Sequence, residues 1–141
     1  MQRLTILAHL RGEADPPSGE PLQTHPRATS ISVDASAADG SDAAIRSIAY
    51  ETHATFTGET TFTETGTITV GDDGELDIVS IGDGTLGPSA DAELLHGTAM
   101  YRVVEGRGTL AGASGLITSN FLLRPASGEF EERQVAIVFL P

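Results

Sequence analysis

Glu64 is the residue whose type and position most directly suggest chemistry. It alternates with Phe62 and Ile68 at the period of two that places side chains on one face of a β-strand. A carboxyl group on an apolar face is poorly solvated, so its pKa rises and it can act as a general acid or base. The alternative is a break in register at Gly58 or Gly66 that returns Glu64 to solvent, because buried unpaired glutamate is rare.

His96 is a second candidate for acid–base chemistry. It shares strand parity with Met100 and Arg102, so an imidazole that titrates near neutral pH would lie beside a guanidinium able to bind an oxyanion. The alternative is a hydrogen-bonded histidine near a strand end, with no role in a pocket.

Two tyrosines and one asparagine can orient a ligand through hydrogen bonds. Tyr50 and Tyr101 carry hydroxyl groups on aromatic rings, although such side chains often serve ordinary packing. Asn120 can donate to a ligand carbonyl or form a hydrogen bond at the rim of the fold. The predicted catalytic residues are Glu64, His96 and Tyr50. The predicted substrate-binding residues are Tyr101, Arg102, Asn120, Met100, Phe62 and Phe121.

Other chemistries lack the residues or the spacing they need. The chain has no cysteine, and its four histidines are scattered without a metal-binding spacing. Residues 72–75 do not have the spacing of a calcium loop, and Ser114 does not lie in a Gly-x-Ser-x-Gly elbow. We therefore predict neither a metal nor a cofactor.

The elements that must position these residues are strands, because period-two alternation recurs between turn signals. The predicted strands cover residues 4–10, 29–33, 48–56, 62–70, 76–81, 94–104, 116–123 and 134–140. The predicted loops include residues 12–26, 34–43 and 82–91, and residues 71–74 form a hairpin turn. The last strand is almost continuously apolar, which predicts burial on both faces.

An antiparallel meander of eight strands tends to close, because closure removes exposed edges. The interior of such a barrel is filled by side chains or holds one small ligand. The sequence therefore predicts an all-β fold, a single domain over residues 1–141 that forms a closed antiparallel eight-stranded barrel with a central apolar pocket.

The glycine-rich stretch at residues 106–115 carries a family resemblance. It lacks the spacing of a phosphate-binding loop, and a strand-like segment follows where a helix should begin. The stretch resembles the Gly-x-Gly-x-Phe-x-x-Ala-x-Gly element of the allene oxide cyclase and dirigent-protein barrels. Gly106, Gly108, Ala113 and Gly115 match, Leu110 replaces the usual Phe, and Glu105 stands where that family commonly has another Gly.

The resemblance covers about residues 97–123, and its motif is mainly structural. It implies an eight-stranded barrel, often a homodimer or homotrimer, whose lumen holds a small hydrophobic molecule. Some members steer a cyclisation without a cofactor. No catalytic residue of that family has a match here.

Charge and composition limit the partners. The formal net charge is −12, with 8 basic residues that are all arginine, and aromatic residues make up 5%. Such a surface repels nucleic acid and anionic membranes. The N-terminal segment is a poor signal peptide, and no apolar run approaches the roughly 20 residues of a membrane span. We therefore expect a cytoplasmic protein that binds neither nucleic acid nor membrane.

These observations predict a cofactor-independent isomerase or cyclase that acts on a small, mostly apolar metabolite in the barrel lumen. One alternative is a non-catalytic protein that binds a small hydrophobic ligand. A second is a structural or assembly module whose outer face, including the threonine ladder at residues 63–69, contacts a partner.

Overall fold

The computed structural model describes residues 1–141 and consists of strands and loops, without helices. The strands are β1 (Gln2–Glu13), β2 (Gln23–Thr24), β3 (Arg27–Ala37), β4 (Ile48–Phe56), β5 (Thr61–Val70), β6 (Gly74–Ser80), β7 (Gly84–Pro88), β8 (Leu95–Gly108), β9 (Ser114–Leu123) and β10 (Glu129–Leu140). No helix of the chain could therefore cross a membrane.

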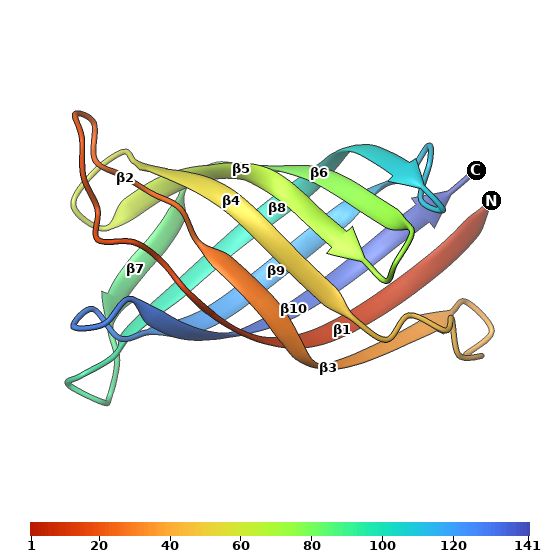
Figure 1. Ribbon diagram of the computed structural model, residues 1–141, viewed down its shortest axis with the longest axis horizontal. Helices are drawn as coiled ribbons and strands as arrows, with labels where there is room; N and C mark the ends of the chain where they lie inside the picture. The colour runs from red at the N-terminus through yellow and green to blue at the C-terminus, as the bar shows by residue number, and fades with distance from the viewer.

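The strands close into an antiparallel barrel with eight positions around its ring. Its strand order is β4-β3-β1-β10-β9-β8-β6-β5, and pairing between β4 and β5 closes the ring. The strands run obliquely to the long axis, and both termini lie at the same end (Figure 1). The prediction of a closed antiparallel eight-stranded barrel is confirmed.

The two short strands extend two of these eight positions. β2 pairs with β4 beyond the point where β3 does, and β7 pairs with β8 beyond the point where β6 does. Pro26, which has no backbone N–H, lies between β2 and β3. Gly82, with φ of 66°, lies between β6 and β7. The breaks between β2 and β3 and between β6 and β7 therefore fall at residues that suit an interruption of the strand hydrogen bonds.

Alternating side chains fill the end of the lumen near the termini. Ile6, Leu76, Ile117 and Val138 point inward and are almost completely buried. These side chains come from four different strands, so the core forms only when the ring closes. Apolar burial of this kind is the main favourable contribution to folding.

The glycine-rich stretch builds a turn that covers this end of the barrel. Leu110 lies in the β8–β9 turn and is only 4% exposed. A side chain at Gly106 would clash with the backbone carbonyl of Leu110, and one at Gly108 would clash with the carbonyl of Asp73. Gly108 also has a positive φ of 66°. The glycines therefore have the structural role expected of a tight turn with close backbone approach.

Four predictions of local structure are wrong. Residues 34–37 of the predicted loop 34–43 belong to β3, because they pair with β1 from Leu7↔Asp34 to Leu4↔Ala37. Residues 23–24 of the predicted loop 12–26 form β2, and β7 lies within the predicted loop 82–91. In each case the neighbouring strand supplies hydrogen-bond partners that outweigh a weak local propensity.

The fourth error concerns the last strand, which is not buried on both faces. Val135 and Ile137 on β10 are each 42% exposed, while Ala136 and Val138 between and beyond them are buried. No second layer covers the outside of this sheet, so alternate side chains face solvent.

Candidate functional site

Glu64 points into the barrel lumen. The register between β4 and β5 is unbroken from Ile48↔Val70 to Phe56↔Phe62, so the alternation that includes Glu64 is preserved. The side chain is 6% exposed. The alternative of a register break that exposes Glu64 is therefore wrong.

Glu132 is a second lumen carboxyl, and sequence reasoning missed it. It lies on β10 and is 3% exposed. The predicted strand begins at Gln134, so the charged residues just before it were not assigned to a strand. Extending the parity of Gln134 and Ala136 backward by one step places Glu132 on the inward face, so the signal was present.

Five neutral hydrogen-bond donors hold the two carboxyl groups. The Glu64 carboxyl accepts hydrogen bonds from Thr52 Oγ1 and from the Tyr101 hydroxyl, the latter at 2.5 Å. The Glu132 carboxyl accepts from the Tyr50 hydroxyl, from Ser119 Oγ and from Gln134 Nε2 at 3.0 Å. No buried side-chain polar atom lacks a partner. The lumen therefore contains a fully hydrogen-bonded polar layer within an apolar core.

Burial governs the protonation of this layer. It raises the pKa of Glu64, the Thr52 and Tyr101 hydroxyls oppose that rise, and the charge of Glu132 adds to it. Burial likewise raises the pKa of Glu132, and its three donors oppose the rise. Both carboxyl groups therefore favour the protonated form more strongly than an exposed glutamate does.

The tyrosine hydroxyls of this layer remain protonated. Burial, followed by the charges of the two glutamates, raises the pKa of Tyr50 and of Tyr101 well above the ordinary value. Each tyrosine therefore acts as a hydrogen-bond donor to a carboxyl group rather than as a phenolate base.

An apolar cavity of about 70 Å³ adjoins the carboxyl pair. It lies toward the end of the barrel at which β2, β7 and the β9–β10 turn are found, away from the termini (Figure 1). Its lining residues are Ala14, Thr24, Pro26, Tyr50, Ala54, Phe56, Phe62, Glu64, Leu86, Tyr101, Phe121, Leu123, Phe130 and Glu132. A cavity of this size holds a few water-sized molecules, whereas sites for drug-sized ligands usually have about 300–1,000 Å³.

Aromatic rings form much of the wall of this cavity. The rings of Phe62 and Phe121 have centroids 6.3 Å apart, and those of Phe121 and Phe130 have centroids 6.4 Å apart. Phe130 also stacks on Tyr50 at 6.5 Å. The carboxyl pair therefore meets a rigid aromatic surface rather than bulk water.

Four of the predicted site residues lie outside the barrel. His96, Met100, Arg102 and Asn120 are exposed, and Met100 is 44% exposed. His96 Nε2 lies 2.6 Å from Asn120 Oδ1 on the neighbouring strand, as the hydrogen-bonded alternative described. The prediction that these side chains share a pocket with Glu64 is wrong, because β8 turns the opposite parity inward.

The other predicted site residues gather at the lumen. Tyr50, Phe62, Glu64, Tyr101 and Phe121 all line the 70 Å³ cavity. Tyr101 and Arg102 are adjacent on one strand, so only one of the two can face the lumen. The structure selects Tyr101, which is 4% exposed.

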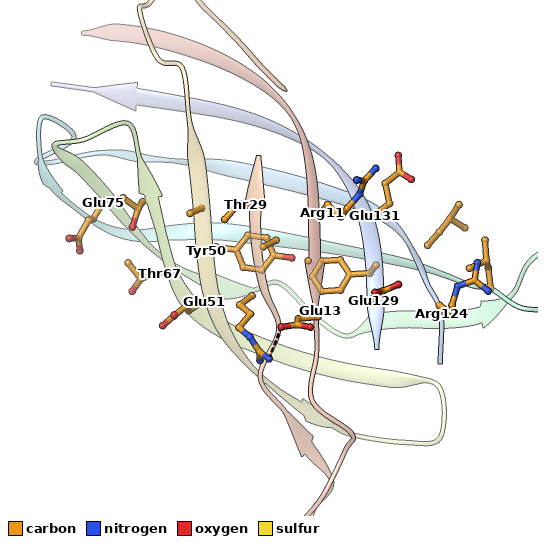
Figure 2. Close-up of a pocket in the computed structure, with 18 residues that line it drawn as sticks. Arg11, Glu13, Thr29, Tyr50, Glu51, Thr67, Glu75, Arg124, Glu129 and Glu131 are labelled. Atoms are coloured by element: carbon orange, nitrogen blue, oxygen red, sulfur yellow. Dashed lines mark hydrogen bonds and ion pairs between the residues drawn. The ribbon is translucent and has the colours of Figure 1, made fainter. Parts of the chain in front are cut away.

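A wider concavity of about 1,190 Å³ is lined by residues of β1, β3, β4, β5, β6, β9 and β10 and of adjoining loops. Figure 2 shows its charged side chains, among them Arg11, Glu13 and Glu131. Arg27 in this concavity is already paired with Glu13 at 3.0 Å. This concavity is open, and its acidic and basic side chains do not converge on one point. The lumen is therefore the better candidate site.

Histidines approach each other at one place on the outer surface. The Nδ1 atoms of His25 and His53 lie 3.4 Å apart, an approach that their separation in sequence did not predict. No group of three or more histidine, aspartate or glutamate side chains is arranged to hold a metal ion.

Comparison of the chain with known protein families, curated proteins and solved structures finds no match. The functional argument therefore depends on the geometry of the lumen.

Proposed function

We propose that the chain is a cofactor-independent isomerase or cyclase that acts on a small, mostly apolar molecule in the barrel lumen. One observation carries this proposal. The two buried carboxyl groups of Glu64 and Glu132 adjoin an aromatic cavity, and each accepts a hydrogen bond from a tyrosine hydroxyl. Buried acids with raised pKa values are typical of groups that transfer protons near neutral pH. Residues 106–115 resemble a structural motif of a barrel family in which some members steer a cyclisation without a cofactor.

The chemistry requires no consumed reagent. An ionised carboxylate removes a proton from one carbon of the bound molecule and returns it to another, so the enzyme is restored after each turnover. The neighbouring protonated carboxyl donates a hydrogen bond to the charge that develops. Tyr50 and Tyr101 fix the two carboxyl groups, and the aromatic walls hold the substrate in a reactive shape.

A non-catalytic ligand-binding protein is the second candidate. The cavity of about 70 Å³ and the complete hydrogen bonding of the lumen favour it, because a binding protein needs no unpaired reactive group. Such a protein would admit a small ligand, or the end of a larger one, without chemical change.

The experiment begins with native mass spectrometry of freshly purified protein, followed by solvent extraction and identification of any retained small molecule. That molecule and its isomers are then incubated with the wild type, with Glu64→Gln and with Glu132→Gln. An enzyme loses turnover in a Gln variant that keeps its circular dichroism spectrum. The exposed Glu51→Gln on β4 is the matched control and should keep full activity. If the retained molecule is never converted, while both Gln variants bind it as the wild type does, the enzymatic proposal is wrong.

The outer face of the barrel supports a proposal about assembly. Exposed apolar side chains occupy neighbouring positions on β1, β10 and β9: Leu7 is paired with Val135, and Ile137 is paired with Leu116. We propose that this face joins copies of the chain into a homodimer or homotrimer, since contiguous apolar surface is typical of interfaces. Light scattering of Val135→Glu, compared with wild type at equal concentration, tests it. A wild-type protein that is monomeric at high concentration contradicts the proposal.

A further inference from the structure

The lumen contains acidic groups and no basic group. Glu64 and Glu132 are the two charged residues among the buried polar side chains, and the chain has no lysine. Arginines 3, 11, 46, 102 and 133 are exposed, and the side chains of Arg27, Arg107 and Arg124 are each more than 40% exposed. When both carboxyl groups ionise, their charge is therefore compensated only by neutral donors, which is costly in a buried site.

The hydrogen bonds leave the carboxyl groups able to accept more. Each carboxylate oxygen has two acceptor positions. Glu64 receives one hydrogen bond on each oxygen, and Glu132 receives one on Oε1 and two on Oε2. Three acceptor positions are thus unused, and both carboxyl groups line the cavity. An ammonium group has only donors, so it matches these positions.

The wall of the cavity also suits a cation. The faces of phenylalanine and tyrosine rings attract positive charge, and Tyr50, Phe62, Tyr101, Phe121 and Phe130 all line the space beside the carboxyl groups. The net charge of −12 raises the local concentration of cations and repels anions. Carboxylates, aromatic faces and overall charge therefore all favour the same sign of ligand.

We propose that the lumen binds a small primary amine in its protonated form. Its ammonium group lies beside Glu64 and Glu132, and its short apolar tail points toward the mouth, where Phe56, Leu86 and Leu123 line the cavity. This inference rests on the proposed function, because it names the ligand class of the same cavity. The volume of about 70 Å³ limits the buried part of the ligand to a few heavy atoms.

The proposal fixes the direction of a pH dependence. The titratable groups that face the ligand are Glu64, Glu132, Tyr50 and Tyr101, and both tyrosines stay protonated. The amine needs ionised carboxyl groups, so its affinity increases as pH rises through their pKa values. A neutral ligand of the same size has no such requirement.

Three probes of equal size and different charge test the proposal: n-propylamine, propan-1-ol and propionate. Binding to the wild type is measured by isothermal titration calorimetry at pH 5 and pH 8, in sodium chloride and again in potassium chloride. We expect n-propylamine to bind at pH 8, more weakly at pH 5, and at least tenfold more tightly than propan-1-ol. Propionate should not bind. Glu64→Gln and Glu132→Gln should each lose at least tenfold in amine affinity, whereas Glu51→Gln should lose none.

The outcomes separate this inference from the proposed function. Equal binding of propan-1-ol and n-propylamine overturns the amine proposal and leaves an apolar substrate pocket intact. If n-propylamine no longer binds when potassium chloride replaces sodium chloride, the site prefers an inorganic cation and the amine proposal is wrong. Failure of all three probes to bind overturns the amine proposal and also argues against an accessible pocket. If a Gln variant does not fold, the comparison of the three probes at two pH values on wild-type protein still decides the question.

Discussion

Replacing both lumen glutamates with glutamine should remove a specific pH dependence from the stability of the barrel. The pKa values of Glu64 and Glu132 are raised above 4.5 in the folded chain, chiefly by burial, whereas the unfolded chain keeps ordinary values. A carboxyl with a raised folded pKa contributes stability that is fully present below 4.5. That contribution is lost as pH rises through the folded pKa. The wild type should therefore become less stable as pH rises from 4.5.

The slope of this loss follows from proton counting. Between 4.5 and the raised pKa values, each carboxyl is protonated in the folded chain and ionised in the unfolded chain. Unfolding then releases one proton per carboxyl, which lowers the free energy of unfolding by about 1.4 kcal/mol per pH unit. Two carboxyl groups together give about 2.7 kcal/mol per pH unit while both are protonated, and half of that after the first ionises. The slope vanishes above the second pKa.

Urea unfolding at a series of pH values from 4.5 to 9, followed by far-ultraviolet circular dichroism, measures this slope. Each single variant, Glu64→Gln or Glu132→Gln, should show about half of the initial slope, and the double variant should show none. Asp39, Asp42 and Asp77 have lowered pKa values, about 2 for Asp42, so their contributions change below 3.8 and outside this range. A double variant with the same pH profile as the wild type would refute the reasoning, because the carboxyl groups would then not be desolvated.

Other substitutions test the apolar packing at the closed end of the barrel, the mouth of the cavity and the outside of the barrel. Leu110→Ala should lower the free energy of unfolding by about 2–5 kcal/mol in urea titrations, because it empties the buried end of the barrel, and a loss below 1 kcal/mol would contradict that role. Gly97→Ala places a methyl group against the ring of Phe121, so it should cost about 1–3 kcal/mol and weaken ligand binding measured by calorimetry. Gly87→Ala has open space around it and should change stability by no more than about 0.5 kcal/mol; equal effects at the two glycines would show that the ring does not limit the mouth. His96→Ala should leave ligand affinity and turnover unchanged, since its side chain lies outside the lumen, and a large loss of turnover would restore the sequence-based assignment.

Much of the barrel is predictable because strand parity is a local property. The alternation in β5 placed Phe62 and Glu64 on one face of that strand, and the register between β4 and β5 is unbroken. The turn at residues 71–74 and the glycine-rich turn before β9 followed from residues that permit unusual backbone angles. Closure followed from the number of strands.

The inward face of β8 was predicted wrongly from the parity of His96, Met100 and Arg102, whereas the more apolar set on this strand, Ala99, Tyr101 and Val103, faces the lumen. Met100 is larger and more apolar than Gly97 or Ala99, yet it faces solvent while those two small residues face the lumen. Space inside a narrow barrel is limited, and the ring of Phe121 occupies the position where a side chain at Gly97 would lie. Single-strand patterns contain no information about the volume available across the lumen.

Glu132 was missed for a different reason. The predicted strand began at Gln134, after the charged residues, although pairing with β1 begins at Glu129. The long-range ladder with β1 extends the strand to Glu129, and the parity of Gln134 and Ala136 then places Glu132 on the inward face.

The position of the polar layer says more about how a ligand would reach it than its composition does. An apolar plug that includes Ile6, Leu76 and Val138 fills the lumen on one side of the carboxyl groups, and aromatic rings border the cavity on the other. Stability does not require such an arrangement, because replacing a buried charged cluster with apolar residues is often neutral or stabilising. The plug seals one approach, so protons and ligands must reach the carboxyl groups from the mouth. A ligand seated there would exclude the remaining water and strengthen every electrostatic interaction with Glu64 and Glu132. Burial away from water makes the ionised carboxyl groups costly in the empty barrel. The same burial would strengthen their electrostatic interaction with a ligand that fills the cavity.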